Sequence, residues 1–385
     1  MSAATSQRFV VLDSFRGIAA LCVVVFHLHL LQGFSQWEFF RSAGLWVEFF
    51  FVLSGFVLCH SYGQRDWHGA QLRDYLISRS CRIFPLHIAM LLVLTLGQLL
   101  LWLAGKPAFL GSMAASEWLP NLLLLQAWLP ESNPFSFNGP AWSISVEFYL
   151  YLGLAAVLLL TPRPWRSVAY ATISAVCVLC VVTGQPFSGS GTFRGVTCFA
   201  IGALAYCLYR RLARTARPLR FASLLELAAL LALYVVLTAH YPAKSLLASL
   251  FFAAFILLFA RENGAISRQL RRPVFEQLGH WSFGIYLTHV VLLHAIDLLL
   301  RSMPALGGPN WLALVTENGN LLVFVATGSA TGDSLFGLGV LLLVIAAAAT
   351  CYRLIEQPGM ALGKRWRQSR WATGESPLVA ARQGT

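Results

Sequence analysis

Charged residues are scarce in this sequence, and acidic residues are the scarcest of them. Only 11% of the 385 residues are charged, with 16 acidic against 28 basic side chains, whereas 57% are hydrophobic. An ordinary soluble domain carries about 25% charged residues. A chain with so little polar surface cannot cover its apolar side chains in water, so lipid is its natural solvent. The composition therefore excludes an ordinary soluble domain and predicts an integral membrane protein.

The sequence also lacks the motifs of several familiar kinds of site. It contains no Walker loop, no dinucleotide-binding fingerprint, no zinc-ligand spacing and no GxSxG elbow. The eight cysteines lie in apolar stretches or in loops expected in the cytoplasm, so we expect no disulfide. Cys177 and Cys180 share a CxxC spacing within an apolar run, which favours packing cysteines over a redox pair. We expect no metal site, so any chemistry has to come from polar side chains within the membrane.

Long apolar stretches predict an all-α integral membrane protein with about ten transmembrane helices. A run of about 18 or more apolar residues is long enough to cross the bilayer. The expected spans are 9–31, 43–62, 83–104, 141–161, 167–184, 193–210, 221–240, 245–260, 281–300 and 334–355. Trp118–Leu129 is too short to cross and has a proline near each end, which predicts a re-entrant or interfacial helix. The stretch 302–333 is rich in glycine, proline and asparagine and predicts a loop.

The basic residues are distributed unevenly over this topology. With a cytoplasmic N-terminus, inner segments hold 21 of the 28 basic residues, whereas outer segments and outer helix ends hold five. Cytoplasmic loops are enriched in lysine and arginine in this way. The pattern predicts that both termini are cytoplasmic, and it explains the net charge of +12 without a nucleic-acid partner. We expect a transmembrane domain at 1–360 and a disordered basic cytoplasmic tail at 361–385.

The first expected span carries Asp13, Arg16 and His27. A charged group near the centre of the bilayer costs at least ~2.5 kcal/mol, so it usually faces a bundle interior or a wet cavity. Eleven residues separate Arg16 from His27, which puts them within about 20° on one helix face and ~16 Å apart along the axis. Asp13 can pair with Arg16, three residues later. These polar groups predict a functional helix that stays in place rather than a cleaved signal peptide.

Three titratable groups from three spans are expected at one depth, in the outer half of the membrane. Counting ~1.5 Å per residue from the ends of the spans places His27, Glu48 and Glu147 at this level. A histidine with carboxylate partners can act as a general base. The alternative is a buried hydrogen-bonded network that only holds the helices together.

Two further groups of polar residues are candidates for a site. Arg79 and Arg82 form an RxxR motif, expected on the inner loop at the mouth of the third span. They suit either positive-inside anchoring or phosphate recognition, for which the planar fork of arginine is well shaped. His289 lies mid-membrane in "FGIYLTH" and is a candidate for a substrate pathway or a cofactor site.

Six sequence blocks follow one another between residue 12 and about residue 358. The first two are "LDSFRGIAALCVVVFH", with ten residues between Arg16 and His27, and "WVEFFFVLSGFVL", with Glu48. The others are "SRSCRIFPLH", "NGPAWSISVEFYLY", "FGIYLTH" and "YRLIEQP". Together they resemble the blocks of acyltransferase family 3, a family of membrane acyltransferases, in the same order. The second block of that family usually has aspartate where this chain has Glu48.

The resemblance implies transfer of an acyl group, commonly acetyl from acetyl-CoA, to a hydroxyl of a sugar outside the cytoplasm. The family's acceptors are envelope polysaccharides, lipopolysaccharide or glycolipids, which implies a bacterial cytoplasmic (inner) membrane. Some members carry a fused SGNH-type domain, and this chain is expected to be a stand-alone member. The implied partners are therefore an acyl-CoA, a glycan acceptor and the lipid bilayer.

The resemblance also implies roles for individual residues. We expect His27 to act as the base, with Glu147 and Glu48 orienting its imidazole. Arg16 is expected to contact the pantetheine arm or to stabilise the oxyanion. The expected cofactor-binding residues are Arg79, Arg82, Arg16 and His289, and the expected substrate-binding residues are Trp142 and Ser143. Direct transfer is the first hypothesis for the chemistry, and an acyl-enzyme intermediate on His27 or Ser143 is the second.

Two other classes of membrane protein stay open. A transporter or flippase for a sugar or glycolipid would also place charges at the bilayer midplane. It predicts inverted repeats and matching broken helices, which the sequence does not show. A structural or sensory membrane protein would leave the aligned face of Arg16 and His27 unexplained.

Overall fold

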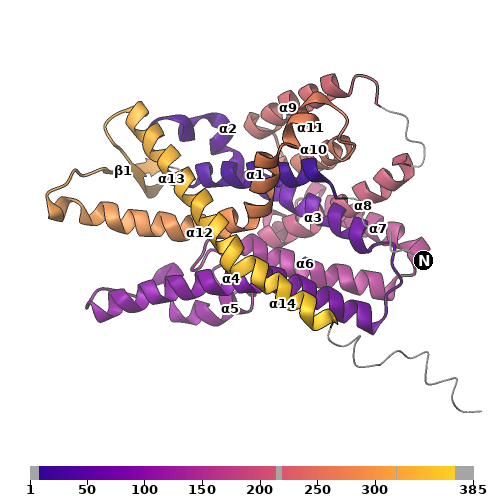
Figure 1. The fold of residues 1–385 in the computed structure, drawn as a ribbon, viewed down its shortest axis with the longest axis horizontal. Helices are drawn as coiled ribbons and strands as arrows, with labels where there is room; N and C mark the ends of the chain where they lie inside the picture. Colours follow the sequence, from indigo (N-terminus) through magenta and orange to yellow (C-terminus); the bar gives the residue numbers. More distant parts are fainter. Residues whose placement is uncertain (1–7, 214–218, 318, 369–385) are drawn as a thin grey trace, which may run out of the picture.

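Helices make up most of the chain. The computed structural model describes residues 8–213, 219–317 and 319–368. The helices are α1 (Val10–Phe26), α2 (Glu38–Arg41), α3 (Trp46–Tyr62), α4 (Gly69–Leu103), α5 (Trp118–Leu122), α6 (Ala141–Leu160), α7 (Arg166–Val182), α8 (Gly191–Ala213), α9 (Ala222–Thr238), α10 (Lys244–Phe259), α11 (Ala265–Leu270), α12 (Pro273–Ser302), α13 (Ala330–Cys351) and α14 (Gln357–Gln368); the strands are β1 (Leu312–Glu317) and β2 (Asn320–Val325). The strand pair lies at the left of Figure 1, whereas the N-terminus and the end of α14 lie in its right half.

Each of the ten expected spans corresponds to a helix in this structure. Within the described residues, seven helical segments, including those built on α4, α6 and α12, are long and apolar enough to cross a membrane, and α9 and α10 are shorter apolar helices. Large apolar side chains stay exposed on the outside of the bundle, for example Leu100 (58% exposed) and Leu103 (72%) on α4. Such side chains are stable in contact with lipid tails, which are as apolar as leucine. The expected multi-pass helical membrane fold is confirmed.

Helix α4 is longer than its hydropathy indicates. It begins at Gly69, fourteen residues before the expected start at residue 83, and runs for 35 residues. Its first turns are polar, so a search for apolar runs detects only the remainder of the helix. As a consequence, Arg79 and Arg82 lie within the helix and not on the loop where the sequence placed them.

Two connecting regions also differ from expectation. The expected helix Trp118–Leu129 is reduced to α5, which ends at Leu122, and hydrogen-bonded turns follow it. The expected loop 302–333 contains the antiparallel pair β1–β2, and Leu30 forms a bridge to Val325 beside it. An Asn-Gly dipeptide between two apolar runs is a strong hairpin signal, so Asn318-Gly319 could have predicted the strand pair.

Helices α1 and α12 pack closely along their length, through glycine. A Cβ added to Gly17 would lie 2.6 Å from the backbone carbon of Leu278, and one added to Gly279 would collide with the backbone of Asp13. Small residues allow membrane helices to approach in this way. The close approach matters for the site, because His27 follows α1 and His289 lies on α12.

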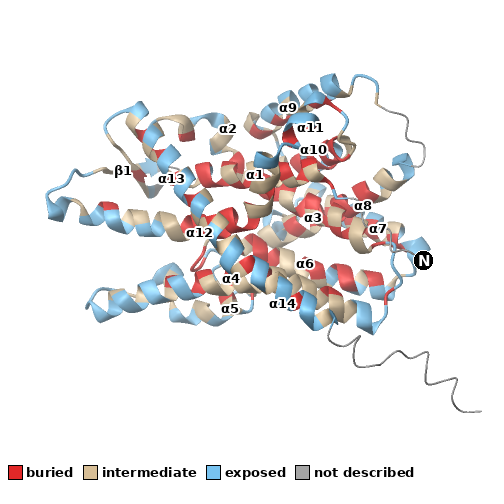
Figure 2. Ribbon diagram, viewed as in Figure 1, coloured by how far each residue is buried: buried red, intermediate tan, exposed pale blue. Residues whose placement is uncertain are grey.

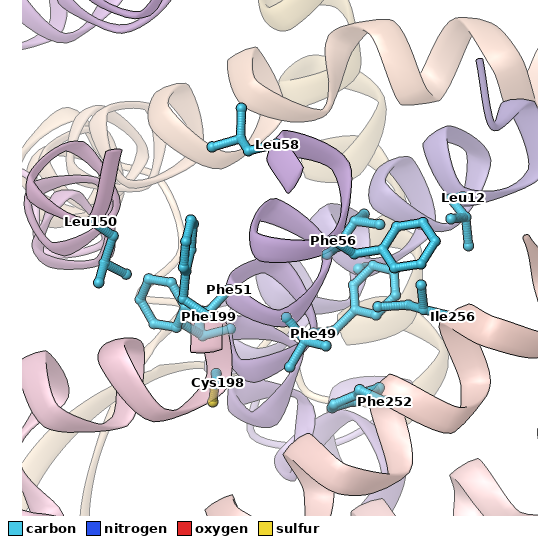
Figure 3. Packing of buried hydrophobic residues seen from close by; sticks show 14 of the residues in the cluster. Leu12, Phe49, Phe51, Phe56, Leu58, Leu150, Cys198, Phe199, Phe252 and Ile256 are labelled. Atoms are coloured by element: carbon cyan, nitrogen blue, oxygen red, sulfur yellow. The ribbon is translucent and has the colours of Figure 1, made fainter. Parts of the chain in front are cut away.

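The central helix of the bundle is α3, whose aromatic side chains pack on several neighbours. The ring of Phe49 contacts Phe252 of α10 at a centroid distance of 5.5 Å, and Phe56 contacts Tyr206 of α8 at 5.8 Å. Buried residues gather around α1 and α3 in the middle of the molecule (Figure 2). Figure 3 shows Phe49 and Phe56 among side chains from adjacent helices. Because α3 is packed on several sides, its position is fixed, and it forms a rigid wall for any cavity beside it.

The chain continues in helical form past the last expected span. A π-helical turn at Tyr352–Glu356 joins α13 to α14, which ends at Gln368. Eight residues of the segment 361–385, expected to be disordered, are therefore helical. A Cβ on Gly359 or Gly363 would touch Pro85 or Cys81, so α14 packs directly against α4. Residues 369–385 of the expected tail lie outside the described residues.

Candidate active site

A charged cavity of 280 Å³ lies between α1, α3, α4 and α6. Its charged lining residues are Arg8, Asp13, Arg16, Arg79, Arg82 and Glu147. Because four of these six side chains are arginines, the cavity has a positive potential that attracts anions. The structure thus brings together four residues that the sequence placed in the site: Arg16, Arg79, Arg82 and Glu147.

Three of these four arginines, including Arg8, pair with carboxylates. Arg16 lies 3.6 Å from Asp13, as their three-residue spacing predicted. Arg82 Nη1 donates a hydrogen bond of 3.0 Å to Oε2 of Glu356, whose side chain is fully buried. Glu356 belongs to the π-helical turn between α13 and α14, a feature often found at functional sites. The pair with Glu356 fixes Arg82 in the cavity wall.

Arg79 is less fully engaged than Arg82. Its guanidinium carbon lies 6.0 Å from the ring centre of Tyr62 and 5.9 Å from that of Tyr151. One of its terminal nitrogens donates to Ser78 at 3.3 Å. Its Nε is buried and has no hydrogen-bond partner among the described residues. A buried donor without a partner is costly, so this side chain is prepared for an acceptor such as a phosphate oxygen.

Glu147 stands where the charged cavity meets a smaller one. It accepts hydrogen bonds from the hydroxyls of Ser54 and Tyr151, the latter at 2.6 Å. The smaller cavity has a volume of 50 Å³ and shares Arg16, Ser54 and Glu147 with the larger one. The two cavities therefore form one path that leads from the arginines into the bundle.

Behind Tyr286, which lines the small cavity, lies a pair of histidines. Tyr286 lines this cavity, and its ring centre lies 5.9 Å from that of His289. His289 Nε2 lies 3.4 Å from His27 Nδ1, and His27 Nδ1 lies 2.9 Å from the carbonyl oxygen of Val23. A carbonyl only accepts, so Nδ1 of His27 carries a proton and Nε2 is left with its lone pair. His27 has the tautomer of a general base, with Nε2 free to accept a proton.

This arrangement corrects the expected partners of His27. Its ring is oriented by the Val23 carbonyl and by His289, and not by Glu48 and Glu147. His289 in turn lies 3.2 Å from the carbonyl oxygen of Ile285 and is fully buried. Neither His289 nor His27 is among the residues that line the two cavities.

Glu48 belongs to a separate network on the other side of α3. Its carboxylate accepts from Arg194 of α8, whose Nε lies 3.0 Å away, and from the hydroxyl of Ser245 on α10 at 2.8 Å. The Glu48 side chain is 1% exposed. The expectation that Glu48 orients His27 is therefore wrong, because Arg194 neutralises this carboxylate within the packing of α3, α8 and α10.

The two expected substrate-binding residues point in different directions. Ser143 lines the small cavity, and its Oγ lies 2.8 Å from the hydroxyl of Tyr286. Trp142 instead packs beside Phe51, and the guanidinium carbon of Arg194 lies 5.9 Å from the ring centre of Trp142. Adjacent residues of a helix lie about 100° apart, so a single site rarely uses both.

A comparison with known protein families fits this constellation. The model of an acyltransferase domain, that of acyltransferase family 3, matches residues 9–353. The chain belongs to acyltransferase family 3. Of the residues in the candidate site, the match leaves out Arg8 and Glu356. The resemblance of the six sequence blocks is thereby confirmed.

Relatives of this acyltransferase occur in several bacteria. Acyltransferase MdmB of Streptomyces mycarofaciens is 27% identical over 387 residues, which cover 92% of each chain. BcsY of Komagataeibacter xylinus, whose name describes a membrane-bound transacylase, is 25% identical over 96% of this chain and 88% of its own. Protein 2 in the picA locus of Rhizobium radiobacter is 32% identical over 38% of this chain and 81% of its own. No solved structure matches the chain.

Sequence reasoning missed several residues of the acyltransferase site. Glu356 and Tyr286 lie in the blocks "YRLIEQP" and "FGIYLTH", so the blocks themselves were a signal that they matter. Ser54 lies six residues after Glu48 on α3, and nothing in the sequence marked it as a partner of Glu147. Tyr151 lies four residues after Glu147 on α6, a spacing that places both on one helix face. Arg194 was counted as an outer basic residue, and only its distance to Glu48 reveals its role.

Proposed function

We propose that this acyltransferase moves an acyl group from cytoplasmic acyl-CoA, with acetyl-CoA as the first candidate, to a hydroxyl of an extracytoplasmic sugar. The acceptor class is a polysaccharide, lipopolysaccharide or glycolipid, and the site of action is the bacterial cytoplasmic membrane, with both termini in the cytoplasm. The succession of residues from the arginine-lined cavity, past Glu147 and Tyr286, to the histidine pair supports this proposal. An arrangement of this kind allows a donor to enter from one side and an acceptor to enter from the other.

The charged cavity suits the donor. Coenzyme A carries a 3′-phosphate and a pyrophosphate, and arginine binds such groups through paired, charge-assisted hydrogen bonds. Arg79 offers a donor without a described partner, and Arg16 and Arg82 add positive charge beside it. The pantetheine arm would then extend past Arg16 towards the small cavity.

His27 carries the chemistry in this proposal. Its Nε2 accepts the proton of the acceptor hydroxyl while the hydroxyl oxygen attacks the thioester carbonyl carbon. The new C–O bond forms, the C–S bond breaks, and the imidazolium returns its proton to the leaving thiolate. Arg16 stabilises the negative charge that develops on the carbonyl oxygen. His289 holds the ring of His27 through Nδ1 and is a positioning residue.

The surroundings of Ser143 favour direct transfer over an acyl-enzyme on this serine. A serine nucleophile needs an adjacent base to remove its proton. The described partners of Ser143 Oγ are the carbonyl oxygen of Pro140 and the hydroxyl of Tyr286, and neither group is a base of useful strength at neutral pH.

Two measurements test the donor and the reaction. Calorimetry on the purified protein in lipid nanodiscs should detect binding of acetyl-CoA, with free CoA and a nucleotide-free buffer as controls. Mass spectrometry of envelope glycans from cells with and without the protein should show an acyl mass on one sugar only in its presence. Absence of binding together with unchanged glycans would refute the proposal and favour a flippase.

The orientation is tested by reporter fusions. A reporter after Thr385 and one within the 63–68 connection between α3 and α4 should both respond as cytoplasmic. A reporter at 305–311, before β1, should respond as extracytoplasmic. Equal responses from the last two would contradict the proposed topology.

A further inference from the structure

The small cavity beyond Glu147 is bounded by apolar side chains on three helices. Its apolar lining residues are Val47, Phe50 and Phe51 of α3, Ile144 of α6 and Phe283 of α12. Arg16, Ser54 and Glu147 lie at the opening that this cavity shares with the charged cavity, and its other polar lining residues are Ser143, Ser282 and Tyr286. A donor that fills the charged cavity would place its reactive end at this opening.

Helix spacing shows which residues lie beyond the opening. On α3, Phe50 precedes Ser54 by four residues and Val47 precedes it by seven, so all three share one face at successive turns. On α6, Ser143 precedes Glu147 by four residues. One turn corresponds to about 5.4 Å. A group that enters past Ser54 and Glu147 therefore meets Phe50 and Ser143 within one turn.

The size of this cavity limits what can enter it. A single water requires roughly 10–15 Å³ of cavity volume measured in the same way. A volume of 50 Å³ thus holds about three to five atoms of this size. An acetyl group has three non-hydrogen atoms and matches the lower figure, whereas propionyl has four and butyryl, with five, reaches the upper figure.

The wall is held in place by its own packing. The ring of Phe50 meets that of Tyr286 edge to face at 5.8 Å, and it also contacts Phe49 at 5.9 Å. Tyr286 is anchored by the hydroxyl of Ser143 at 2.8 Å. Close-packed walls of this kind do not expand easily for an extra methylene group.

We propose that the small cavity is the acyl pocket of the enzyme and that Phe50 is the residue that limits the transferred group to two carbons. The proposal rests on the proposed function, since it assumes that an acyl-CoA occupies the charged cavity. Ile144 forms the second wall, and the Ser143–Tyr286 pair lines the pocket on the side towards His289. One additional methylene in a filled pocket typically changes kcat/KM by roughly 10- to 200-fold.

The test compares acetyl-, propionyl- and butyryl-CoA with the same acceptor in each purified variant. The wild type should show kcat/KM for propionyl-CoA at least about tenfold below that for acetyl-CoA. In Phe50→Ala the ratio of propionyl to acetyl transfer should rise by about tenfold or more. The ratio is measured within one sample, so it does not depend on how much of each variant is folded.

The matched control is Phe49→Ala, which removes the same side chain one residue earlier. Phe49 packs on Phe252 and Phe255 on another side of α3 and does not line the cavity. Its ratio should equal that of the wild type. If Phe50→Ala yields no folded protein, Phe50→Leu and Ile144→Ala provide the same enlargement in smaller steps.

The outcomes separate this proposal from the function on which it rests. Equal kcat/KM for the three donors in the wild type would overturn the acyl pocket while acyl transfer stands. An unchanged ratio in Phe50→Ala, or an equal rise in Phe49→Ala, would also overturn it. No transfer from any of the three donors would refute the proposed function and this pocket together.

Discussion

Two glutamates lie at opposite faces of helix α3 and have different surroundings. On the face towards α8 and α10, Glu48 is 1% exposed and forms an ion pair with Arg194. On the face towards α1 and α6, Ser54 donates a hydrogen bond to Glu147, which lines two connected cavities. From the sequence, both glutamates were expected at one depth and in one role.

The difference teaches how to separate a structural from a functional charge within a membrane. A carboxylate that is buried in the packing and paired with an arginine, as Glu48 is, has its charge neutralised and does not border a cavity that a substrate could enter. A carboxylate that has only hydroxyl partners and borders a cavity keeps its charge available. The depth of a carboxylate in the membrane does not distinguish these cases, because depth does not show whether an arginine or a cavity lies beside the carboxylate.

The largest effect on activity should come from His27, at the end of the path on the cavity face. His27→Ala removes the proton acceptor, and general base catalysis contributes roughly 10²- to 10⁴-fold to a rate. We expect kcat to fall by this amount, with unchanged yield and donor binding. His29→Ala is the control, since His29 stacks on Phe324 near the hairpin and should retain nearly full activity. Wild-type turnover by folded His27→Ala would exclude His27 as the base.

Glu48 and Glu147 test the two faces directly. Glu48→Ala leaves Arg194 without its partner, and breaking a buried pair costs up to about 3–5 kcal/mol. We therefore expect a lower melting temperature and a lower yield for Glu48→Ala, with near-normal kcat per folded molecule. Glu147→Gln should behave in the opposite way, with a reduced rate and a normal melting temperature. The contrast between the faces fails if both variants lose the same property.

The inner arginines should show a smaller effect, on donor affinity. A charge-assisted hydrogen bond contributes about 1.5–3 kcal/mol, so Arg79→Ala should raise the KM for acetyl-CoA by roughly 10- to 100-fold. Arg79→Lys should restore this affinity only in part, because lysine lacks the planar fork. Arg82→Ala should additionally lower the melting temperature, since it leaves buried Glu356 unpaired. Full rescue by lysine at position 79 would indicate simple anchoring at the membrane surface.

The smallest effect is expected at His289, which acts through His27. One neutral hydrogen bond contributes about 0.5–1.5 kcal/mol, so His289→Ala should lower kcat by about fivefold. Because an imidazole must be unprotonated to act as a base, the wild-type rate should rise with pH. His289→Ala should displace this profile, and His289→Gln, which keeps an acceptor, should restore it. A slower variant with an unmoved pH profile would point to packing alone.

Local patterns in the sequence were sufficient for much of this structure. Hydropathy located the ten long helices, and helix geometry put Asp13 beside Arg16. The same patterns failed at the first turns of α4, which are polar, and at the strand pair, where a strong turn signal was overlooked. Both failures occurred where the chain leaves the apolar interior, because hydropathy carries little information there.

The sequence by itself determined the class of protein, its helical spans, its family and most of the residues around the charged cavity. These features depend on composition and on neighbours three or four residues away, which a linear sequence records. Only the tertiary structure decided that His27 meets His289 across 262 positions, that Arg82 meets Glu356 across 274, and that Glu48 belongs to Arg194. A buried charge pairs with whichever opposite charge the packing brings within about 3 Å. Local sequence patterns do not determine how ten helices pack against one another.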